Sequence, residues 1–101
     1  MFYIETKTTI DMYTYILIYD NETATRETMK THLDSISEIL SWRFDMPNCF
    51  FVYSNESANR LTELLASRLP NYKCFLFSEI PLNKQGYLRK ETWKFINQSQ
   101  N

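Results

Sequence analysis

Hydrophobic and polar positions change their spacing several times along the chain, and each change predicts a new element of secondary structure. The residues Tyr13–Tyr19 are β-branched, aromatic or leucine, a composition typical of a β-strand. From about Ala24 the apolar residues recur at steps of four, three and four, which predicts one face of an amphipathic helix. That helical stripe consists of Met29, Leu33, Ile36 and Leu40.

The following residues predict a hairpin, a second helix and a fourth strand. Residues 39–44 and 49–53 are expected to be strands, joined by a turn at 45–48 because a proline there cannot donate to a sheet. The start of the first of these strands is left open, because Ile39 and Leu40 also fit the preceding helix. Pro70 ends a second apolar stripe, and residues 72–80 predict the last strand. The second stripe consists of Ala58, Leu61, Leu64, Leu65 and Leu69.

The element order β-α-β-β-α-β predicts an α+β fold of the ferredoxin-like type, a four-stranded antiparallel sheet with both helices on one face. We divide the chain into an N-terminal extension at 1–11, a ferredoxin-like domain at 12–81, and a C-terminal turn and short helix at 82–101. The short helix is expected at about 89–97.

The first strand predicts where a partner binds, because alternate side chains of a strand face opposite sides. We expect Ile16 and Ile18 to lie under the helices and Tyr13, Tyr15 and Tyr19 to lie on the uncovered face. An exposed apolar face of this kind usually marks a partner surface. A homodimer that stacks sheet on sheet would cover it, and a single-stranded RNA platform is the alternative.

Composition narrows the range of partners and compartments. The 101 residues carry 11 basic and 12 acidic side chains, so no bulk positive field attracts nucleic acid or an anionic membrane. No apolar run approaches the roughly 20 residues of a membrane span, and no signal peptide is visible, so a cytoplasmic protein without a membrane partner is expected. Cys49 and Cys74 lie in apolar runs and are expected to be buried free thiols.

Asp20 is the residue with the strongest chemical argument. It follows the best predicted strand and precedes a helix N-terminus, a position suited to a divalent cation such as Mg²⁺ or to a phosphate. The alternative is that Asp20, Asn21 or Thr23 only caps the helix. One aspartate is too few for a metal site, so Glu22 or a second Asp20 across a dimer axis would have to complete it.

The C-terminal segment combines basic and aromatic residues, a pattern suited to a nucleic-acid surface because bases stack on rings and cations bind phosphate. The alternative is an ordinary amphipathic helix, with Trp93 and Ile96 facing inward and the lysines in water. The candidate nucleic-acid residues are Lys84, Arg89, Lys90, Trp93 and Lys94.

Several of these segments together resemble the small Cas2-like proteins, which include CRISPR-associated Cas2 and the VapD-type ribonuclease toxins. The resemblance lies in the strand that ends at Tyr19 and Asp20, in the segment NCFFVYS at 48–54, in the helix at 58–69 and in the closing strand at 72–80. The segment GYLRKETWKFI at 86–96 is similar to the SinR-like branch.

The resemblance implies a ferredoxin-like homodimer that acts on or around nucleic acid in a bacterial or phage defence setting. For the nuclease members it also implies a metal-dependent phosphodiesterase centre at the dimer axis, where Asp20 would be the catalytic and Mg²⁺-binding residue. Many Cas2-like proteins are structural dimers. The alternative function is therefore a non-catalytic protein–protein interaction module, a scaffold or inhibitor in a defence or anti-defence system.

Overall fold

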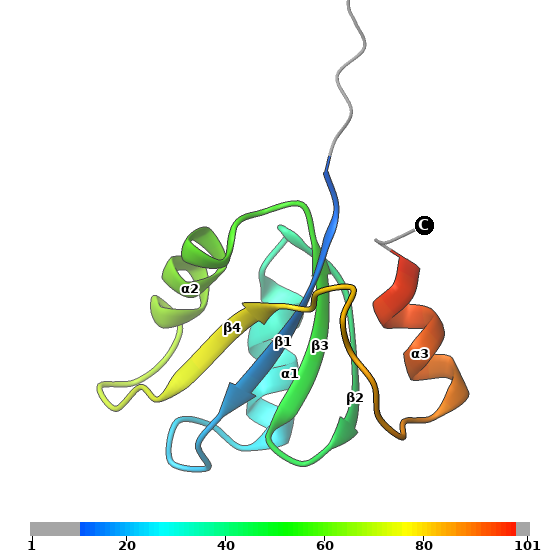
Figure 1. Ribbon diagram of the computed structural model, residues 1–101. Coiled ribbons are helices and arrows are strands. Elements are labelled where there is room, and N and C mark those ends of the chain that lie inside the picture. The colour runs from blue at the N-terminus through cyan, green and yellow to red at the C-terminus, as the bar shows by residue number, and fades with distance from the viewer. Residues whose placement is uncertain (1–10, 99–101) are drawn as a thin grey trace, which may run out of the picture.

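Four strands form one antiparallel sheet in the computed structural model of the protein, which describes residues 11–98 (Figure 1). The sheet order is β2-β3-β1-β4. The predicted α+β class and the antiparallel four-stranded sheet are confirmed, and all but one residue of the predicted N-terminal extension lies outside the described residues. The elements are β1 (Tyr13–Tyr19), α1 (Arg26–Ser35), β2 (Ile39–Met46), β3 (Cys49–Ser54), α2 (Ala58–Ala66), β4 (Phe75–Glu79) and α3 (Lys90–Asn97).

Local hydrogen bonds explain where the element ends differ from the predictions. α1 begins at Arg26, later than Ala24, because the Thr25 hydroxyl accepts the Thr28 N–H at 3.1 Å and caps the helix. The helix ends at Ser35, so the prediction that Leu40 belongs to its apolar stripe is wrong; Leu40 lies on β2 and is exposed. β2 extends past the predicted end to Met46, whereas α2 and β4 are shorter than predicted.

One face of the sheet is covered by α1 and α2, and the tyrosines lie there. Tyr15 and Tyr19 are buried in the core that both helices close, and Tyr13 packs against it. The prediction that these tyrosines form an uncovered partner surface is therefore wrong. A tyrosine can bury its ring while its hydroxyl stays hydrogen-bonded: the Tyr15 hydroxyl donates to the Glu56 carbonyl at 2.6 Å. The Tyr19 hydroxyl, in contrast, is buried and has no hydrogen-bond partner among residues 11–98.

The opposite face is partly covered by α3, as Figure 1 shows, where the segment after β4 crosses the sheet to reach that helix. Ile96 is buried against Cys49 and Phe51 of β3, and Trp93 and Ile16 pack on the same cluster. The expected inward orientation of Trp93 and Ile96 is confirmed. The expectation that Ile16 and Ile18 lie under α1 and α2 is wrong, because both lie on the face that α3 partly covers, and Ile18 remains 43% exposed there.

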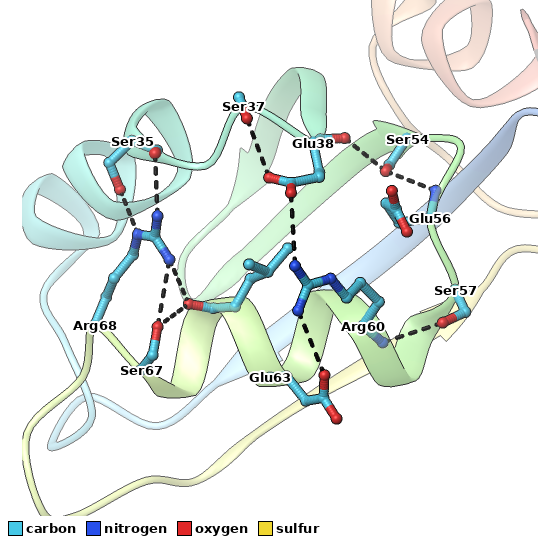
Figure 2. Close-up of polar contacts among 11 residues, drawn as sticks. Ser35, Ser37, Glu38, Ser54, Glu56, Ser57, Arg60, Glu63, Ser67 and Arg68 are labelled. Atoms are coloured by element: carbon cyan, nitrogen blue, oxygen red, sulfur yellow. Dashed lines mark hydrogen bonds and ion pairs between the residues drawn. The ribbon is translucent and has the colours of Figure 1, made fainter.

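Polar side chains join α1 to α2 at the surface of the core that these two helices close (Figure 2). The Arg68 guanidinium donates to the Ser35 hydroxyl at 2.8 Å and to the Leu64 carbonyl at 2.7 Å. Arg60 forms ion pairs with Glu38 at 3.9 Å and with Glu63 at 3.6 Å. Arg68 thus connects the segment after α2 to the end of α1, and Arg60 connects α2 to the residue before β2, at the rim of the core that both helices share.

Candidate functional site

Asp20 lies in a polar turn at the end of β1. One carboxylate oxygen accepts the Glu22 N–H at 3.3 Å, and the other accepts the Tyr72 hydroxyl at 2.8 Å. The Thr23 hydroxyl accepts the Cys74 N–H at 2.8 Å and ties the same turn to the start of β4. Because the α1 cap is Thr25, the alternative that Asp20, Asn21 or Thr23 caps this helix is wrong.

The hydrogen bond between Tyr72 and Asp20 has an electrostatic consequence. The Asp20 carboxylate accepts a hydrogen bond from the phenol of Tyr72, and its negative charge lies close to it. Both effects favour the neutral phenol and raise the pKa of Tyr72 to about 12. Within residues 11–98 no group of three or more His, Cys, Asp or Glu side chains is arranged to hold a metal ion. One chain therefore supplies Asp20 as a single, already hydrogen-bonded carboxylate, which does not fit Mg²⁺ by itself.

Arg89, which sequence analysis placed on a nucleic-acid surface, has a partner within the chain although its side chain is exposed. The Arg89 guanidinium forms an ion pair with Asp45, and the Arg89 backbone N–H donates to the same carboxylate at 3.1 Å. Arg89 is the N-cap residue of α3, so this carboxylate lies at the helix N-terminus, where a helix favours a negative charge. Asp45 thus acts as the anchor of α3 on β2.

The Asp45 carboxylate also meets the hydroxyl of Thr92, which accepts a hydrogen bond from the Arg43 guanidinium. Desolvation opposes the ionisation of Asp45, but the hydrogen bonds from Arg89 and Thr92 outweigh it and hold the pKa of this carboxyl below its ordinary value. Sequence analysis missed Asp45 and Thr92, because a threonine in a helix and an aspartate near a turn give no sign of a partner more than forty residues away.

The other candidates of the C-terminal segment do not form one surface. Trp93 packs on the sheet, and the Lys84 ammonium donates to the Pro81 carbonyl at 3.1 Å. Lys90 and Lys94 are exposed on α3 beside Glu91. The structure therefore brings Arg89 and Trp93 to the sheet and leaves two lysines in water, as in the amphipathic-helix alternative.

A row of four apolar residues crosses the sheet on the α3 side, and three of them extend beyond the part that α3 covers. Cross-strand pairs link Met46 to Cys49, Cys49 to Ile18, and Ile18 to Leu76. Ile18 and Met46 are each 43% exposed and Leu76 is 54% exposed, whereas Cys49 is buried. We call Met46, Cys49, Ile18 and Leu76 the open row.

Grooves lie at both ends of the open row. One, of about 270 Å³, is lined by Ile18, Asp20, Cys74 and Leu76. The other, of about 350 Å³, lies between the sheet and α3 and includes Met46. Asp20 therefore lies next to the open row, because both line the first groove. The predicted order of helices and strands does not by itself show this proximity.

The two cysteines differ in exposure, so the prediction that both are buried is wrong for one of them. Both are free thiols, Cys49 buried and Cys74 exposed. Cys74 precedes β4 and lines the groove beside Asp20. Burial raises the pKa of the Cys49 thiol.

Comparison with protein-family models, curated proteins and solved structures finds no match for this chain. The Cas2-like resemblance therefore stays a prediction. No helix among residues 11–98 combines the length and the apolar character needed to cross a membrane.

Proposed function

We propose that this chain is a ferredoxin-like, non-catalytic protein-interaction module, and that the open row is its binding surface. The sheet order β2-β3-β1-β4, with α1 and α2 on one face, supports the ferredoxin-like assignment. The observation that carries the proposed function is that large apolar side chains remain exposed on a sheet face that α3 covers only in part.

The open row favours a protein partner over nucleic acid. Its exposed members, Ile18, Met46 and Leu76, offer apolar contact, which suits the fully buried centre of a protein interface. A nucleic-acid surface needs cations near phosphate, whereas the members of the open row carry no charge and Arg89 is paired with Asp45. The net charge of −1 points the same way.

A photo-crosslinking amino acid in place of Ile18, in cells that express the protein, tests the proposal. We expect a covalent adduct with one defined protein. The purified partner should then bind the wild type, and Ile18→Asp should weaken binding about tenfold or more, because it puts a charge in an apolar contact.

Leu40 is the matched control position, since it is 57% exposed on β2 at the far edge of the sheet. The same crosslinker there should give no such adduct, and Leu40→Asp should leave the affinity unchanged. Adducts with RNA or DNA at Ile18, or equal adducts at both positions, would overturn the assignment of the open row to a protein.

A second candidate is the metal-dependent nuclease that the resemblance implies. It is favoured by one observation: Asp20 borders the same groove as Ile18 and Leu76, so a second copy on this surface would bring a second Asp20 near the first. Two carboxylates could then hold Mg²⁺, which would neutralise charge on a phosphodiester.

This second candidate predicts that Mg²⁺ lowers the pKa of Tyr72, because the cation would compete for the Asp20 carboxylate. It also predicts RNA or DNA cleavage that Asp20→Ala abolishes without loss of the dimer. A Tyr72 titration unchanged by Mg²⁺, together with no cleavage, would eliminate it and leave the interaction module.

A further inference from the structure

The two edges of the sheet are built differently. Along the β2 edge the pairing register shifts twice, and the Arg89 guanidinium donates to the Asp45 carbonyl at 3.4 Å. Bulges and charged side chains are the usual means of preventing a sheet edge from pairing with another chain. The β4 edge has no such shift: its register against β1 is regular, and its apolar residues Phe75, Leu76 and Phe77 lead into Ser78 and the charged Glu79 at one end.

The backbone of β4 presents a defined set of groups to solvent. The Asp20 N–H donates to the Cys74 carbonyl at 3.0 Å, and the Ile80 N–H donates to the Thr14 carbonyl at 2.9 Å. Hydrogen bonding alternates along an antiparallel strand, so the even-numbered residues of β4 face β1. The N–H and C=O groups of Phe75, Phe77 and Glu79 therefore point outward from the sheet.

We propose that a second copy of this chain pairs with β4 in antiparallel register, on a twofold axis through Leu76. In this register Phe75 of each copy pairs with Phe77 of the other through the outward backbone groups. Leu76 then meets its own counterpart on the open face, and Cys74 lies opposite Ser78 of the other copy. The result is one continuous eight-stranded sheet.

Charge complementarity selects this register. Centring the pairs on Leu76 sets Lys73 of each copy opposite Glu79 of the other, once at each end of the shared ladder. Both side chains are exposed, and no ion pair among residues 11–98 involves either of them. A shift of the axis to Phe77 would instead set Glu79 opposite Phe75 and Lys73 opposite Pro81, which cannot donate to a ladder.

The inference goes beyond the proposed function, because it assigns a partner to the edge backbone and not to the open face. The two surfaces meet at Leu76, where the open rows of the two copies would join across the axis. The dimer would therefore lengthen the open row to twice its span. It leaves Ile18 and Met46 available to another protein.

Disulfide trapping tests the register. Opposed residues that are not hydrogen-bonded have Cα atoms about 4.5 Å apart, within the range of a disulfide. In Ser78→Cys, mild oxidation should join the native Cys74 of one copy to position 78 of the other, and peptide mapping should find this linkage. Ser41→Cys, an exposed serine on the opposite edge strand, is the matched control and should stay unlinked.

Three results would overturn the proposed register. They are a disulfide between the two copies of position 78, a disulfide between the two copies of Cys74, and equal linkage in the Ser41→Cys control. Sedimentation of the wild type as a monomer at all accessible concentrations would overturn the dimer. Either failure leaves the crosslinking result at Ile18 intact, so the proposed function and this inference fail separately.

Charge exchange gives a second, independent measurement. Lys73→Glu sets carboxylates opposite each other at both ends of the ladder and should weaken the dimer about tenfold. Adding Glu79→Lys to the same chain restores opposite charges and should return the dissociation constant to that of the wild type. An unchanged constant in the single variant, or no recovery in the double variant, contradicts the pairing of Lys73 with Glu79.

Discussion

The carboxylate of Asp45 is the polar group that holds the sheet and α3 together. Its side chain is only 4% exposed, and it accepts bonds from the guanidinium and the backbone of Arg89. A buried carboxylate is stable in the ionised form only when such donors surround it. The charge of this residue, which sequence analysis assigned to a turn, therefore contributes to the docking of α3 beside the apolar contacts of Ile96.

Asp45→Asn is expected to destabilise the protein by roughly 1.5–3 kcal/mol at neutral pH, the usual range for a hydrogen bond to a charged group. The pKa of Asp45 is lower in the folded chain than its ordinary value of 3.8. Its contribution is therefore present above pH 3.8 and is lost as the pH falls through the folded pKa. Urea unfolding followed by tryptophan fluorescence should show the wild type and the variant converging in acid.

Glu63→Gln is the control for this prediction. Glu63 also forms an ion pair, but its side chain is 60% exposed, so its loss should cost less than about 1 kcal/mol. Equal losses in the two variants would show that Asp45 contributes no more than a surface charge.

The titration of Tyr72 reports on the Asp20 turn. The pKa of Tyr72 is raised to about 12 by its hydrogen bond to Asp20, so Asp20→Asn should return it toward 10.0. The raised pKa stabilises the fold below pH 10, and this contribution is lost as the pH rises toward 12. NMR titration of ¹³C-labelled tyrosine, assigned with Tyr72→Phe, measures the shift.

Tyr15 provides an internal control in the same spectra. Its pKa is also about 12, but the first cause is burial, so Asp20→Asn should leave it unchanged. If Tyr72 titrates near 10 in the wild type, its bond to the Asp20 carboxylate does not persist in solution.

Among the elements, α3 has the largest effect on what the sheet can do. It buries Ile96 against β3 and so removes part of a face that would otherwise be available to a partner. The sequence predicted this helix and its apolar side, because Trp93 and Ile96 lie three residues apart. It did not predict the surface that the helix covers.

Ile96→Ala should cost about 2–4 kcal/mol, since the side chain is 2% exposed and truncation leaves a cavity. Weaker packing of α3 should also speed the reaction of Cys49 with a thiol reagent, because Cys49 is buried under this helix. Lys94→Ala, on the exposed side of α3, should change neither property. If Cys49 reacts as fast as Cys74 in the wild type, α3 does not shield the sheet.

β1 shows how far a strand pattern can be interpreted from sequence. Alternation placed the tyrosines and isoleucines on opposite faces, and the structure agrees. Which face receives α1 and α2 depends on how large side chains fill the space beneath two helices, and strand periodicity carries no information on that. The contacts of Asp20 with Tyr72 and of Asp45 with Arg89 are likewise products of tertiary packing between segments far apart in sequence.

At the scale of the whole molecule, α1 and α2 cover a buried core on one side of the sheet, and α3 partly covers a smaller apolar cluster on the other. The closed side is held by α1 and α2 and by the polar contacts of Arg60 and Arg68 (Figure 2). All the surfaces proposed for binding lie on the side of α3 or at the β4 edge. The exposed residues proposed for binding thus lie apart from the closed core that α1 and α2 cover.

This division predicts that the open row can be changed at little cost to folding. The double variant Ile18→Thr and Met46→Gln should bind less of a fluorescent apolar dye, and its melting temperature should stay within about 5 °C of the wild type, since exposed substitutions usually cost less than 0.5 kcal/mol each. A larger drop in melting temperature would show that the row is part of the core.

The chain order of these parts has a consequence during folding. β4 ends at Glu79 and α3 begins at Lys90, so the four strands can pair before the helix that shelters Ile16 and Phe51 has docked. An intermediate with the sheet formed and α3 undocked would expose both side chains to water, and exposed apolar surface of this kind promotes aggregation. The rate at which α3 docks would therefore set how long each folding molecule is prone to associate with another.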